Sequence, residues 1–149
     1  GQFSIRSGLG MMHLRSEYLF GVQPGFKSNS KSPNESKLPS TDTYIRNFSG
    51  GYVILVQDFG KLPFSALVKY DWYDPNTKVS GTEIGAAGSN FTAANIRYST
   101  LGVGYLNYLT ENVKLVVYYA HVKNEKTALP GYTNDLKDNV FTFRIQFRF

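Results

Sequence analysis

The segment VFTFRIQFRF, Val140 to Phe149, alternates strictly between apolar and polar side chains from Phe141 onward. A period of two places its aromatic side chains on one face of a β-strand and its Thr, Arg and Gln side chains on the other. In a soluble sandwich the apolar face of such a strand packs into the core, and in a membrane barrel it contacts lipid. The strand alone therefore predicts two-sided β-structure without identifying the solvent on either side.

The same alternation recurs along the chain, and the connections between the alternating segments fall into two length classes. The other segments are residues 11–20, 44–58, 64–73, 98–109 and 113–123, with a truncated strand, QFSIRS, before them. Short turns alternate with long polar loops, which we expect at about 21–43, 74–97 and 124–139. Antiparallel strands connected in this way form a meander with all its long loops at one end. We therefore expect an all-β fold with one antiparallel sheet.

The two faces of the expected sheet differ in composition. One parity carries the ionic and amide side chains of His13, Arg15, Glu17, Gln57, Lys69, Asp71, Lys114, Arg144, Gln146 and Arg148. The other carries apolar side chains, many of them bulky aromatics near strand ends: Tyr44, Phe48, Tyr52, Ile54, Val56, Phe64, Trp72, Tyr105, Phe147 and Phe149. Aromatic girdles, short turns at one end and long loops at the other are typical of outer-membrane barrels. We therefore expect an antiparallel transmembrane β-barrel, with a soluble β-sandwich or lipocalin-like barrel as the alternative.

Barrel closure limits what the 149 residues can form alone. A single-chain membrane barrel needs at least ~8 strands, and the alternating segments supply six to seven. We expect residues 1–149 to be one barrel segment, the C-terminal part of a larger barrel whose N-terminal majority precedes it. A barrel closed by several identical chains is the alternative.

Several stretches of the chain resemble a known family. They are LRSEYLFGVQPG (14–25), FSGGY (48–52), VKYDWYDPNTKVSG (68–81), LGVGYLNYLTENVKL (101–115) and DLKDNVFTFRIQFRF (135–149). Together they are similar to the C-terminal part of the phosphate-selective porin O and P family, and they extend over nearly the whole chain. The resemblance implies a trimeric porin in the bacterial outer membrane that passes phosphate. It also implies that Phe149 is part of the signal read by the barrel assembly machinery.

The face assignment and the resemblance together predict a function. Basic side chains on a pore wall attract anions, and the expected wall residues are Arg15, Lys69, Lys114, Arg144 and Arg148. The expected lipid-facing residues are Phe143, Phe147 and Phe149. We expect a water-filled pore for small anionic solutes such as phosphate. General diffusion without selectivity, and a structural or anchoring barrel subunit of a surface complex, are the alternatives.

Other function classes have little support in the sequence. There is no cysteine, so thiolate metal sites and cysteine nucleophiles are excluded. Asp71, Asp74 and Asn76 read as a turn rather than a cation loop, and we expect no metal or cofactor. His13 and His121 lie in no serine-nucleophile motif, so we expect no enzyme. Basic and aromatic side chains fall on opposite faces, which argues against nucleic-acid binding despite the formal net charge of +5.

Overall fold

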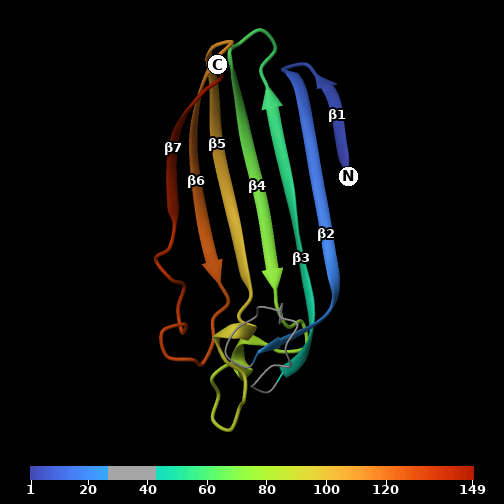
Figure 1. Ribbon diagram of the computed structural model, residues 1–149, viewed down its shortest axis with the longest axis vertical. Coiled ribbons are helices and arrows are strands. Elements are labelled where there is room, and N and C mark those ends of the chain that lie inside the picture. Colours follow the sequence, from blue (N-terminus) through green and yellow to red (C-terminus); the bar gives the residue numbers. More distant parts are fainter. Residues whose placement is uncertain (27–42) are drawn as a thin grey trace.

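The computed structural model describes residues 1–26 and 43–149, and it contains one antiparallel sheet in which seven strands follow one another in chain order. Figure 1 shows the strands side by side, with the short turns at the top and the long connections at the bottom. The strands are β1 (Gln2–Ser7), β2 (Gly10–Phe26), β3 (Thr43–Asp58), β4 (Phe64–Asp74), β5 (Tyr98–Thr110), β6 (Val113–Asn124) and β7 (Val140–Phe147). The expected all-β antiparallel meander is confirmed. Within the described residues, the outer edges of β1 and β7 have no partner strand.

The short turns hold the upper end of the sheet in a defined geometry. Gly10, at the start of β2, has a φ of 138°, which side-chain-bearing residues rarely adopt. A Cβ atom there would overlap the carbonyl oxygen of Asp58 in the neighbouring hairpin. At the turn between β5 and β6, the carbonyl of Asn112 accepts a hydrogen bond from the backbone N–H of Arg148 (2.9 Å). The chain therefore stays bound to this turn one residue beyond the end of β7.

Strand β2 is longer than the sequence pattern predicts. Its pairing with β3 continues to Phe26, so Gly21 to Phe26 extend a strand where a loop was expected. Pro24 is tolerated because β1 pairs only with the first residues of β2, up to Arg15, and Pro24 therefore lies at an edge where no N–H is needed. The central part of the expected loop 21–43, residues 27–42, lies outside the described residues.

The register places the side chains on two faces of different chemistry. Directly paired residues on neighbouring strands lie on the same face of the sheet. The face that we call the polar face contains the paired row Arg15, Ile54, Lys69 and Gly102. It carries the charged strand residues Arg6, Arg15, Glu17, Arg46, Asp58, Lys69, Asp71, Lys114 and Arg144, together with His13. The apolar face carries Phe3, Leu14, Tyr18, Phe20, Val53, Leu55, Val68, Tyr70, Trp72, Leu101, Val103, Tyr105, Val117, Tyr119, Phe141, Phe143, Ile145 and Phe147.

The parity expected for β3 was wrong. Gln57 pairs with Met12 and Ala66, so it lies on the apolar face, where its amide donates to the carbonyls of Met11 (3.3 Å) and Asp58 (2.7 Å). The apolar residues of β3 that were expected to face lipid lie instead on the polar face. They are Tyr44, Phe48, Tyr52, Ile54 and Val56. The physical reason is that both faces of this strand are apolar between Tyr52 and Val56, so its own pattern does not fix the orientation.

The connections after β4 and β6 pack together at the loop end of the sheet. The carboxylate of Glu125 accepts hydrogen bonds from the backbone N–H groups of Gly81 (2.8 Å) and Arg97 (3.3 Å), and so joins the two connections. Ile84 and Ile96 are almost completely buried between them. The helical segments of the described chain are two short 3-10 turns, η1 (Gly81–Glu83) and η2 (Ala93–Asn95), and neither they nor any other described helix is long and apolar enough to cross a membrane.

Candidate functional site

The polar face gathers four of the five basic residues expected to line a pore. Arg15 on β2, Lys69 on β4, Lys114 on β6 and Arg144 on β7 all have polar-face parity in the register. Arg148 follows the last residue of β7 and is exposed. The four strand residues are therefore spread across the sheet along one face.

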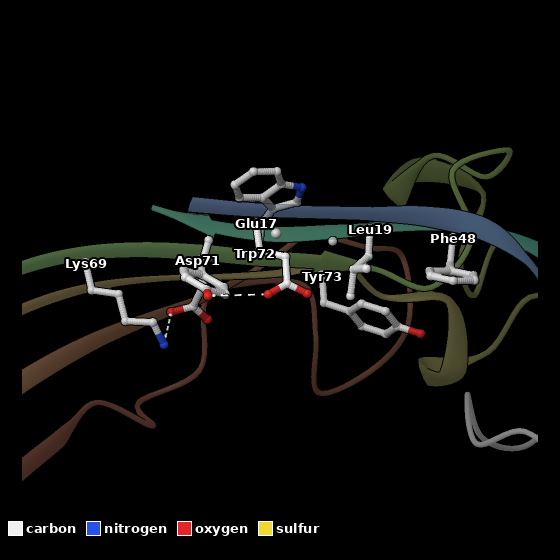
Figure 2. Close-up of a pocket in the computed structure, with 10 residues that line it drawn as sticks. Glu17, Leu19, Phe48, Lys69, Asp71, Trp72 and Tyr73 are labelled. Atoms are coloured by element: carbon white, nitrogen blue, oxygen red, sulfur yellow. Dashed lines mark hydrogen bonds and ion pairs between the residues drawn. The ribbon is translucent and has the colours of Figure 1, made fainter. Parts of the chain in front are cut away.

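Near the loop end, the polar face contains a hollow of about 300 Å³, which we call the loop-side pocket. Its polar-face side chains are Glu17, Leu19, Phe48, Tyr52, Lys69, Asp71 and Tyr73. Figure 2 shows the carboxylates of Glu17 and Asp71 and the ring of Tyr73 extending from the same side of the sheet, with the indole of Trp72 on the other side. Gly50, directly opposite Tyr73 and Leu19, leaves the floor of the pocket without a side chain.

The charged groups of the loop-side pocket are arranged partly as the sequence suggests. Lys69 forms an ion pair with Asp71 (2.9 Å), as expected for neighbours on one strand face. Glu17 accepts a hydrogen bond from the Tyr52 hydroxyl (3.4 Å), and no ion pair joins it to Arg15 among the described residues. Asp71 is therefore paired along β4 with Lys69 rather than with the turn after β4. Asp74 holds that turn instead by accepting the backbone N–H of Asn76 (2.9 Å).

Toward the short turns, a larger cavity of about 510 Å³ lies on the same face. We call it the turn-side cavity, and its polar lining includes Gln2, Ser4, His13, Arg15, Asp58, Tyr108 and Lys114. The ammonium group of Lys114 lies 5.5 Å from the centre of the Tyr108 ring, a cation–π distance. Arg15 and Lys114 are thus brought to one cavity from β2 and β6, whereas Lys69 lines the loop-side pocket.

The turn-side cavity also contains a hydrogen-bonded series that sequence reasoning missed. Ser4 lies 2.8 Å from Nδ1 of His13, Nε2 of His13 lies 3.1 Å from Asp58, and Ser65 donates to the other oxygen of Asp58 (2.5 Å). The order serine, histidine, aspartate resembles the catalytic relay of a serine hydrolase. Here, however, the serine contacts Nδ1 and the aspartate contacts Nε2, the reverse of the arrangement in those enzymes. Ser4 lies inside a regular strand, not on the sharp turn that exposes a nucleophile beside an oxyanion hole. The absence of enzymatic activity stays a prediction.

One signal in the sequence does predict the position of Asp58. The short connection 59–63 makes β3 and β4 a hairpin, and the hairpin places Asp58 opposite Ser65. Ser65 shares its parity with Lys69, so Asp58 must share the polar face as well. Counting residues across the turn therefore orients β3 where its own alternation does not.

The loop after β4 contacts the polar face beyond the loop-side pocket. The side chain of Arg46 has polar-face parity and is only 3% exposed. Its Nε donates to the side-chain carbonyl of Asn95 (3.2 Å) in η2, and the same oxygen accepts from the amide of Asn76 (3.0 Å). The loop is thereby tied to the charged side of the sheet.

On the opposite side lie the aromatic residues near the end of the chain that were expected to face lipid. Phe143 and Phe147 are paired within the apolar face, and Phe149 extends past the end of β7. A row of stacked and tilted rings lies nearer the loop end, in which Tyr18 and Tyr70 both contact Trp72, with ring centres 6.1 Å and 5.8 Å away.

No protein-family model, curated protein or solved structure matches the chain. The similarity to the phosphate-selective porin O and P family stays a prediction that rests on the stretches quoted above.

Proposed function

We propose that this chain forms part of the wall of a bacterial outer-membrane porin, a water-filled pore for the diffusion of small anionic solutes such as phosphate. In this proposal the apolar face contacts lipid and the polar face lines the lumen. The strands alternate lipid-facing and lumen-facing side chains, as membrane barrel strands do.

The observation that carries the proposal is the segregation of charge between the two faces. On the described strands, charged side chains of the apolar face are confined to Asp74 and Lys123, both at the loop end. Between them and the short turns this face is mostly aromatic and aliphatic, with uncharged polar side chains such as Gln57 and Asn107 near the short turns. Its rings are nevertheless open to solvent, and Phe20 and Phe141 are 75% and 67% exposed. Hydrocarbon is a solvent in which such an exposed surface is stable and a charge is not.

The two edges of the sheet support its membership of a closed wall. An exposed strand edge presents unpaired N–H and C=O groups, which cannot be left unsatisfied within hydrocarbon. The described residues place no partner outside β1 or β7. We propose that further strands close the barrel at these edges, that the porin is trimeric as the family resemblance implies, and that the barrel assembly machinery inserts it through the strand ending at Phe149.

The preference for anions rests on the balance of charge along the polar face. Its strand residues include six Arg and Lys side chains and three Asp and Glu side chains. Low-dielectric walls focus the field of such an excess into the lumen, which raises the local concentration of anions. Exposed arginines such as Arg144 and Arg148 provide successive weak sites, and conduction requires sites that an ion can also leave.

The test is the ion selectivity of the assembled pore in a planar bilayer. The double variant Arg144→Glu/Arg148→Glu changes the wall charge at two positions of the same parity, one in β7 and one directly after it. We expect the reversal potential in a salt gradient to shift toward cation preference, because the anion-attracting groups are replaced by anion-repelling ones.

A matched control separates the wall charge from the overall charge. Lys126→Glu/Lys137→Glu makes the same change of net charge in the exposed connection between β6 and β7, and should shift the reversal potential much less. If the arginine variant keeps the wild-type ion preference, Arg144 and Arg148 do not line a selective path. A bilayer that shows no conductance with correctly inserted protein would favour the structural or anchoring barrel instead.

A further inference from the structure

The loop-side pocket differs in chemistry from the rest of the proposed lumen. Aromatic and aliphatic groups form its walls, with the rings of Phe48 and Tyr73 in tilted contact at 6.4 Å between centres. Leu19 and Tyr73 are exposed on this face, so apolar surface is available to a bound molecule. A basic wall for small ions alone has no need for such a group of rings.

The charge of the loop-side pocket argues against a simple anion as its ligand. Its carboxylates belong to Glu17 and Asp71, and its one ammonium group, that of Lys69, is already paired with Asp71 at 2.9 Å. The pocket therefore has an excess of negative charge. The turn-side cavity, which holds Arg15 and Lys114, has the opposite character.

Aromatic rings beside hydrogen-bonding carboxylates are complementary to a neutral sugar. A pyranose ring presents C–H groups on its faces, which pack against aromatic rings, and hydroxyl groups around its rim. A carboxylate accepts hydrogen bonds at both oxygens, and an ammonium group donates to hydroxyl oxygens, so both kinds of group bind hydroxylated molecules without requiring them to be charged.

We propose that the loop-side pocket is a binding site for one pyranose ring of a neutral saccharide. The ring packs against Tyr73 and Phe48, and its hydroxyl groups donate to Glu17 and Asp71 while Lys69 donates to a hydroxyl oxygen. The cavity of about 300 Å³ is at the small end of ligand sites, which suits a single sugar ring and not a large molecule.

The orientation of Tyr73 is fixed by a second group. Its hydroxyl accepts a hydrogen bond from the side-chain amide of Gln23 (2.8 Å), a residue of the extended part of β2. The site is thus built from β2, β3 and β4 together, and its aromatic wall is positioned before a ligand arrives. A wall ordered in advance lowers the entropic cost of binding.

This inference rests on the proposed function only in placing the pocket in water, so the two are tested by different readouts. Calorimetric titration of the folded protein in detergent with methyl α-D-glucopyranoside measures binding without any conductance. We expect saturable binding to the wild type and a loss of roughly tenfold or more in affinity for Tyr73→Ala. Tyr73→Phe, which keeps the ring, should retain most of the affinity.

The matched control is Tyr70→Ala, which removes a tyrosine of the same strand from the apolar face. It should bind the glucoside as the wild type does. Titration with inorganic phosphate should show no competition, since the pocket repels anions. The inference is overturned if the wild type shows no saturable binding, if Tyr73→Ala binds as well as the wild type, or if phosphate displaces the glucoside. A glucoside-binding protein without conductance would overturn the porin proposal and leave the pocket assignment intact.

Discussion

The two faces of one sheet use the same backbone and differ in almost every other respect. On the apolar face, large hydrophobic side chains lie exposed from β1 to β7, with Phe143 and Phe147 among them. On the polar face, Ser65 and Arg46 are nearly buried, at 2% and 3% exposure, and are hydrogen bonded. A water-soluble domain buries its apolar groups, whereas this sheet leaves them exposed over one whole face.

The location of the buried apolar residues supports the same reading. The hydrophobic residues that the described structure buries are Ile84, Ala94, Ile96 and Ala120, three of them in the connection between β4 and β5. Apart from the loop end, where the connection after β4 contacts the polar face at Arg46, neither face of the sheet is covered by a second layer of the described chain (Figure 1). The sheet is therefore not stabilised by a core of its own, and each face must meet its solvent directly.

The largest effect should come from placing a charge in the middle of the apolar face. Phe143→Lys puts an ammonium group where we propose lipid, which costs about 2–4 kcal/mol near the bilayer midplane. Urea unfolding from lipid vesicles should show a loss of stability of that size. Thr142→Lys adds the same charge one residue away on the polar face and should cost far less. Equal losses for the two variants would mean that the faces do not differ in solvent.

A smaller effect should separate two adjacent glycines on opposite faces. A Cβ at Gly51, on the apolar face, would lie 2.6 Å from the Glu17 carbonyl oxygen and 2.8 Å from the Trp72 ring. At Gly50 the nearest atoms are 3.1 Å and 3.2 Å away. We expect Gly51→Ala to lose about 1–3 kcal/mol through overpacking, and Gly50→Ala to lose less. The same vesicle unfolding assay measures both, and a greater loss for Gly50→Ala would show that the close packing of Trp72 is misassigned.

The smallest effect concerns the loop end, outside both faces. The backbone N–H and hydroxyl of Ser80 hydrogen bond to Glu83, and they hold the pKa of that carboxyl below its ordinary value. A depressed pKa in the folded state means that this carboxylate stabilises the loop at neutral pH. The contribution is lost as the pH falls through that pKa. NMR titration should find Glu83 titrating below a typical glutamate, and Ser80→Ala should raise its pKa. Because alanine keeps the backbone N–H, an unchanged pKa in Ser80→Ala would remove the Ser80 hydroxyl, and not the backbone N–H, as a cause.

Much of the sheet could be predicted from the alternation of side chains alone. The closing strand from Val140 and the strand from Phe64 have a strict period of two, so their faces were assigned correctly. The short turns at 59–63 and 111–112 and the order of strands followed from loop length. The basic residues Arg15, Lys69 and Arg144 were placed together on one face because each lies in a strand with a clear pattern. The strand that carries Lys114 has apolar residues on both faces, and its pattern alone does not fix the orientation.

The remaining features depend on pairing between strands, which a local pattern does not encode. Pro24 and Gly25 read as a loop, and pairing with β3 overrides that preference. The loop-side pocket needs the aromatic residues of β3 on the polar face, and only the register with β4 places them there. His13 and Asp58 are 45 residues apart in sequence and meet because β2 and β3 are neighbours.

The most direct test of the two-faced sheet uses its single tryptophan, Trp72, which lies on the apolar face. In vesicles, its fluorescence should be strongly quenched by phospholipids with brominated acyl chains and little affected by aqueous iodide. The paired variant Trp72→Phe/Tyr73→Trp moves the fluorophore by one residue to the polar face, and the order of quenching should reverse. Quenching of Trp72 by iodide but not by brominated lipid, with no reversal in the paired variant, would contradict the assignment of lipid to the apolar face and water to the polar face.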